Sequence, residues 1–67
     1  MRDARDGITE EIKSRGFKQS TIAVKAGLTE QQLSDIVNKR RKLEANEMFA
    51  LCKAMGITPD ILFNAAP

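Results

Sequence analysis

The phrase Gly–aliphatic–Thr constrains this chain most, because it combines a residue that ends one helix with a residue that begins the next. It occurs as GLT at 27–29, as GIT at 56–58 and as GIT at 7–9. Glycine adopts without penalty the left-handed conformation that commonly closes a helix. Threonine accepts a hydrogen bond from the first turn of the following helix. The phrase therefore predicts helix junctions, which divide the chain into short helices.

The middle copy continues in a way that strengthens this prediction. In GLTEQQL, residues 27–33, Thr29 and Gln32 have the spacing of a capping box. Leu28 and Leu33 occupy the two positions of a hydrophobic staple. In the copy at 56–58, Pro59 follows the threonine at the first helical position, where its missing N–H costs nothing.

Between the junctions, apolar residues recur with helical rather than alternating spacing. We expect helices over about 18–26, 30–38, 45–55 and 59–64, after a first helix that ends near Arg15. That first helix begins either at Asp3 or at Thr9, because Gly7 would cost about 1 kcal/mol in a helix interior. The expected fold class is all-α, a compact five-helix bundle that forms one domain over residues 1–67.

Composition narrows the possible functions. Cys52 is the single cysteine and histidine is absent, so a disulfide, a zinc site and histidine-based catalysis have no basis in this sequence. We therefore expect no cofactor, no metal and no enzymatic activity. No apolar stretch approaches the length that crosses a membrane. The expected location is the cytoplasm of a bacterium, with either a bacterial or a phage gene.

Charge is distributed unevenly along the chain. Residues 1–16 are neutral, whereas residues 17–43 contain six basic and two acidic side chains, a net charge of +4. Residues 44–67 contain one basic and three acidic side chains, a net charge of −2. The basic middle third predicts an anionic partner.

Residues 17–38 have the pattern of a helix-turn-helix unit, two short helices joined by a tight glycine turn. Ala23 is small enough for close helix approach, Gly27 makes the turn, and Leu33 and Ile36 face inward. The outward face of the second of these helices then consists of Glu30, Gln31, Ser34 and Asp35. Such a helix enters the major groove, where glutamine suits adenine and acidic side chains suit cytosine N4. We expect these four residues to contact bases.

Phosphate contacts are expected around this face. Backbone N–H groups near Gln19 and in the turn after Asn38 are candidates, and Gln32 is another unless it serves only the capping box. The cations Lys39, Arg40, Arg41 and Lys42 would provide affinity that does not depend on sequence. The acids Glu30 and Asp35 would repel phosphate unless each finds a donor.

These residues resemble the phage repressor and Cro group of helix-turn-helix proteins, also called the xenobiotic-response-element family. The stretches FKQSTIAVKAGLTEQQLSDIVNKRR and MFALCKAMGITPDILF carry the resemblance, which covers the chain from Ile8 to Phe63. It implies a five-helix fold, phosphate contacts at Gln19 and Asn38, and dimers on pseudo-palindromic operators. Lys39 departs from the family pattern, which usually has glycine there, and Lys18 stands where serine or threonine usually caps the helix.

We therefore predict a sequence-specific regulator that binds double-stranded DNA, a repressor that occludes a promoter as a homodimer. The alternative is an antitoxin or another protein-interaction module of the same fold, whose partner would be a toxin. Ile61, Leu62 and Phe63 cannot all face one small core, so Phe63 is the expected dimer contact.

Overall fold

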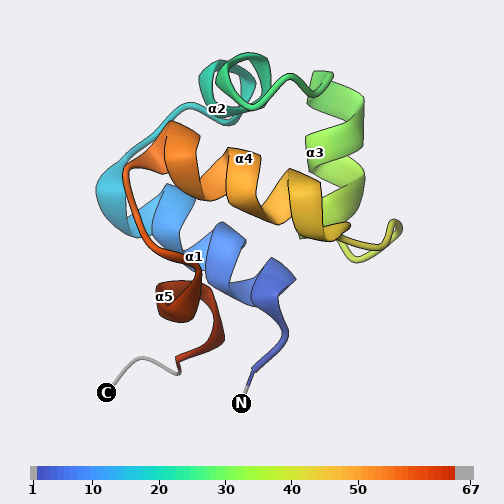
Figure 1. Cartoon of the computed structure of the whole chain (residues 1–67). Helices are drawn as coiled ribbons and strands as arrows, with labels where there is room; N and C mark the ends of the chain where they lie inside the picture. Colours follow the sequence, from blue (N-terminus) through green and yellow to red (C-terminus); the bar gives the residue numbers. More distant parts are fainter. Residues whose placement is uncertain (1, 65–67) are drawn as a thin grey trace.

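The computed structural model describes residues 2–64 and consists of five α-helices joined by short turns (Figure 1). No strand occurs in this described range, so the expected all-α class is confirmed. The bounds agree with the expected ones to within about one residue at each end from the second helix onward. The helices are α1 Ala4–Arg15, α2 Gln19–Lys25, α3 Glu30–Val37, α4 Ala45–Met55 and α5 Pro59–Phe63.

The glycine-based junctions are confirmed at two of their three places. Gly27 and Gly56 both have positive φ, 76° and 69°, and close α2 and α4. After Gly27, the Thr29 hydroxyl accepts from the Gln32 N–H at 3.0 Å, and the Gln32 carboxamide oxygen accepts from the Thr29 N–H at 2.9 Å. The predicted capping box is therefore present. Thr58 precedes α5 but its side chain makes no cap hydrogen bond.

The third copy of the phrase, at 7–9, does not mark a junction, and of the two predicted starts of the first helix, Asp3 and Thr9, the structure has the one at Asp3. α1 begins at Ala4 with Asp3 as its cap, and Gly7 lies in the helix interior. A Cβ atom on Gly7 would stand 2.2 Å from the backbone oxygen of Leu62. Glycine is present here because α5 packs directly on the backbone of α1, and this close approach compensates for its low helix propensity.

The core is formed by all five helices. Leu62 is completely buried, whereas Ile61 and Phe63 are only partly covered, as expected from the size of the core. The buried apolar residues are Ile8, Ile12, Ile22, Ala23, Leu33, Ile36, Leu51, Cys52, Met55 and Leu62.

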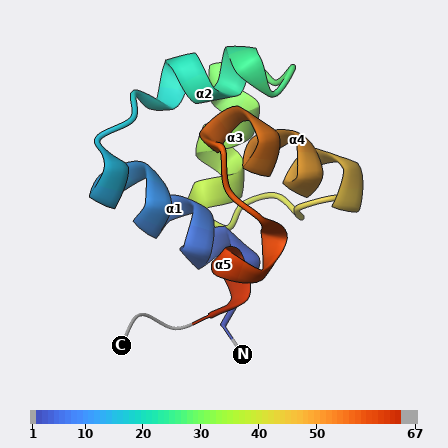
Figure 2. The same ribbon diagram turned by 60° about the vertical axis from the view of Figure 1, so that its left-hand side comes forward.

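The packing leaves one side of α3 free of other helices. α1 packs on α5 and α3, and α2 packs on α3 and α4. In Figure 1, α2 lies across the top and α3 runs down the right-hand side, and Figure 2 shows α3 behind α1 and α2 after rotation. The start of α2 and the outer face of α3 consequently border the same region of surface.

Candidate nucleic-acid interface

A hollow separates the start of α2 from the outer face of α3. Its lining is polar and comes from both helices of the helix-turn-helix unit: Lys18, Gln19, Ser20, Glu30, Gln31 and Ser34. The structure thus brings together the Gln19 side chain and three of the four residues predicted to contact bases. The arrangement offers amide, hydroxyl and carboxylate groups next to a lysine, all of which can form hydrogen bonds with a ligand.

The recognition face, defined as Glu30, Gln31, Ser34 and Asp35, is held in place by the opposite side of α3. Leu33 and Ile36 are completely buried, which fixes the rotation of the helix about its axis. Glu30 and Gln31 are exposed, and Ser34 and Asp35 are half-buried.

Asp35 joins the recognition face to the loop that follows α3. Its Oδ1 atom accepts a hydrogen bond from Gln31 Nε2 at 2.9 Å and another from Arg40 Nε at 3.1 Å. The backbone N–H of Arg40 also donates to the Asp35 carbonyl at 2.7 Å. Asp35 was expected to need a hydrogen-bond donor beside DNA, and it has two: the Gln31 amide and the Arg40 guanidinium. Glu30 has no such partner among residues 2–64.

The basic loop, defined as residues 38–42, turns back at Lys39. Lys39 has φ 61° and is the one non-glycine residue with positive φ in the described range. It therefore keeps the left-handed conformation that glycine would adopt at this place. Asn38 stabilises the turn, because its Nδ2 atom donates to the Ser34 carbonyl at 2.8 Å.

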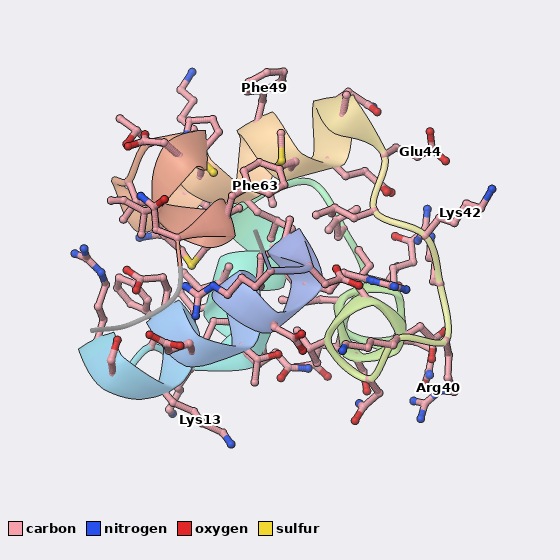
Figure 3. All side chains as sticks on the ribbon, turned by 90° about the horizontal axis from the view of Figure 1, so that it is seen from below. Lys13, Arg40, Lys42, Glu44, Phe49 and Phe63 are labelled. Carbon is pink, nitrogen blue, oxygen red and sulfur yellow. The ribbon has the colours of Figure 1, made fainter. Side chains whose placement is uncertain are left out.

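The four cations of the basic loop differ in whether their charge is already paired with an acidic side chain of the protein. Lys39 pairs with Asp6 at 2.9 Å, and Arg41 pairs with Glu47 at 2.6 Å. Glu47 is buried, so the Arg41 guanidinium points toward α4 rather than toward the recognition face. Lys42 forms no ion pair within residues 2–64, and Figure 3 shows it extending away from the protein while Arg40 stays close to the end of α3.

Three pKa values outside the interface reflect local structure. The Arg5 side chain beside Asp3 is the main reason that the pKa of Asp3 falls to about 2, and the same contact raises the pKa of Arg5. Burial raises the pKa of the Cys52 thiol, so this residue behaves as core and not as a reactive thiolate. Among residues 2–64, no cluster of acidic or cysteine side chains could hold a metal ion.

Three residues that the sequence analysis did not propose as site residues lie at notable places on the surface. Two of them line the hollow, and the third is an exposed aromatic residue. Lys18 and Ser20 line the hollow, and the sequence alone distinguishes Lys18 only by its place where serine or threonine usually caps the helix. Phe49 on α4 is 57% exposed. The apolar residues of α4 that recur at helical spacing are Met48, Leu51, Cys52 and Met55, and these pack in or against the core. Phe49 falls outside this spacing, and that was the signal in the sequence that could have identified it as exposed. Phe49 projects from α4, whereas Phe63 lies between α4 and α1 (Figure 3).

The fold and the polar surface of α3 together define the class of protein. A glycine turn joins α2 to α3, and α3 presents a polar face beside a basic loop, which is the arrangement of a helix-turn-helix DNA-binding domain. Comparison with known families matches the helix-turn-helix family over residues 8–62. The chain belongs to this family of DNA-binding transcription regulators, in agreement with the resemblance to the phage repressor and Cro group.

Comparison with solved structures identifies a protein of the same fold. The crystal structure of the restriction-modification controller protein C.AhdI from Aeromonas hydrophila is similar, with a TM-score of 0.83 and 23% sequence identity. The similarity covers 90% of this chain and 91% of that protein, and it shows a common fold. Curated protein sequences gave no match. No helix within residues 2–64 is long and apolar enough to cross a membrane.

Proposed function

We propose that the protein is a transcriptional repressor that binds a pseudo-palindromic operator as a dimer and blocks a promoter. The observation that carries this proposal is the position of the recognition face, which borders the hollow at the start of α2 and is followed at once by the basic loop. In this proposal α3 lies in the major groove of DNA, with the first residues of the helix near the edges of the bases. The cations of the basic loop, which follow α3, then lie near the phosphates. The similarity to a controller protein of a restriction-modification system is consistent with gene regulation.

The geometry supports the following division of contacts, which is part of the proposal. Glu30, Gln31, Ser34 and Asp35 face the bases. The phosphate contacts are Gln19, Gln32, Asn38 and the four cations of the basic loop. Gln32 uses its carboxamide oxygen in the capping box, which leaves its N–H groups as donors. Arg41 must exchange Glu47 for phosphate, so we expect it to contribute less than Lys42.

Gln31→Ala tests the base contact. A glutamine that bonds an adenine edge contributes about 1–3 kcal/mol of discrimination, so the variant should bind the preferred operator that much more weakly. It should also accept other bases at one position. Selection of bound sequences from a random duplex pool, followed by titration, measures both effects.

Lys42→Ala is the matched variant for phosphate contact. It should weaken binding to every duplex by a similar factor and reduce the salt dependence by about one ion. If Gln31→Ala instead behaves like Lys42→Ala, the recognition face is assigned to the wrong residues. If the native chain shows no salt-dependent DNA binding at all, the repressor proposal is wrong and a protein-interaction role takes its place.

The dimer contact is proposed at Phe63. Phe63 is half-buried beside Met48 in a groove between the start of α1 and α4, and the exposed Phe49 adds apolar surface on α4. In a dimer on one face of DNA, the two α3 helices would lie about 34 Å apart, one helical turn.

Phe63→Ser should weaken self-association and convert cooperative binding of a two-half-site operator into independent binding of each half-site. Sedimentation equilibrium and titration of one-site and two-site duplexes measure these changes. Val24→Ser serves as the control, because Val24 is 75% exposed on α2 and no residue of α2 lines this groove. Equal self-association of the Phe63 variant and the native chain would place the dimer contact elsewhere.

A further inference from the structure

The two hydrogen bonds to Asp35 Oδ1 constrain how Gln31 can meet a base. A carboxamide has two N–H donors and one oxygen acceptor. Asp35 uses one of the donors of Gln31, at 2.9 Å. The tip of Gln31 is then left with one donor and one acceptor, and its orientation is fixed because rotation of the amide would break the bond to the carboxylate.

We propose that Asp35 is a positioning residue that makes Gln31 select adenine over guanine. This inference rests on the proposed function, since it assigns specificity within the same interface. Adenine presents the N7 acceptor and the N6 donor in the major groove, which match one donor and one acceptor of Gln31. Guanine presents two acceptors, N7 and O6. An unrestrained amide could turn its N–H groups toward both, but the bond to Asp35 prevents that turn.

The bond to Asp35 leaves guanine incompletely paired. Because one N–H of Gln31 is committed to Asp35, the single free N–H can satisfy N7 or O6 of guanine but not both. Adenine pairs its N7 acceptor with that N–H and its N6 donor with the Gln31 oxygen, so both groups of Gln31 are used.

Arg40 makes an acid tolerable beside DNA. An isolated carboxylate on this face would be repelled by the phosphates. The Arg40 guanidinium lies 3.1 Å from the Asp35 carboxylate and compensates its negative charge. The backbone N–H of Arg40 also donates to the backbone carbonyl of Asp35 at 2.7 Å. Asp35 is therefore held from the helix side by the buried Ile36 and from the loop side by Arg40.

The decisive measurement compares four duplexes that differ only at the position relaxed by Gln31→Ala. The native chain should prefer adenine over guanine by about tenfold. Asp35→Ala should reduce this ratio to about twofold while raising affinity for all four duplexes, because it removes a negative charge. In a chain that already carries Gln31→Ala, the further change Asp35→Ala should leave the ratio unaltered, since the effect acts through Gln31.

Asp6→Ala is the matched control. Asp6 also pairs with a cation of the basic loop, Lys39, but does not touch the recognition face. It should raise affinity for all duplexes and leave the adenine-to-guanine ratio unchanged. If Asp35→Ala behaves in the same way as Asp6→Ala, the inference is overturned while the proposed function stands. A native chain that does not prefer adenine over guanine at this position would also overturn the inference, whereas only the absence of salt-dependent DNA binding would overturn the proposed function.

A measurement without DNA examines the hydrogen bond directly. The Nε2 resonances of Gln31 in the free protein should shift in Asp35→Ala and stay in place in Asp6→Ala. Unchanged resonances in Asp35→Ala would overturn the inference. Far-ultraviolet circular dichroism of both variants should match the native chain, because neither side chain belongs to the buried core.

Discussion

Gly7→Ala is expected to destabilise the protein by about 3 kcal/mol, the upper part of the range for overpacking. Alanine is normally the better helix former, by about 1 kcal/mol, so the expected sign is opposite to the one that helix propensity predicts. The reason is that the new Cβ would stand 2.2 Å from the Leu62 oxygen and 2.6 Å from its Cα. These are backbone atoms and have no rotamer that could relieve the contact, so α5 would have to move away from α1.

Urea unfolding followed by circular dichroism measures this loss, and the melting temperature should fall by roughly 15 °C. Ser14→Ala on the exposed side of α1 is the control and should change stability by less than about 0.5 kcal/mol. A Gly7→Ala chain as stable as the native one would contradict the packing of α5 on α1.

Leu33→Ala is expected to cost about 3 kcal/mol as well, because it deletes most of a completely buried side chain. Leu33 also holds α3 to the rest of the domain from the side opposite the recognition face. A cavity beneath α3 should loosen the helix, so DNA affinity should fall even at temperatures where the variant is folded. In a domain of 67 residues this is a large share of the total stability.

Unfolding curves and operator titration at low temperature test the two parts of this prediction. Val37→Ala on the same helix removes a partly buried side chain and should cost only about 1 kcal/mol. If both variants lose the same stability, Leu33 does not have the anchoring role that its burial indicates.

The helices, the core and the recognition face follow from local sequence. Gly27, Thr29, Gln32 and Leu33 encode a helix end, a cap and an anchor within seven residues, and each adopts the expected conformation or contact. The sequence predicted that Ile61, Leu62 and Phe63 cannot all face the core, and in the structure Leu62 alone of the three is completely buried. These features depend on interactions between neighbours in the chain, and a sequence displays such neighbours directly.

The ion pairs of the basic loop were beyond local prediction. Lys39 finds Asp6, which lies on α1, and Arg41 finds the buried Glu47 on α4. Four consecutive cations appear equivalent in the sequence, yet one points to α1, one to the recognition face, one to α4 and one to solvent. Their availability for phosphate depends on which acids the fold brings near, and charge counting carries no information about that.

By itself, the sequence determined that this chain forms short capped helices around an aliphatic core, with an amide-bearing face on the third helix and cations after it. Tertiary structure alone decided that α1 runs through Gly7 without a break, and that Lys39 of the basic loop is paired with Asp6 of α1. The physical reason is the same in both cases. Each feature depends on a partner that lies far away in the sequence and that only folding brings near: the backbone of Leu62 for Gly7, and the carboxylate of Asp6 for Lys39.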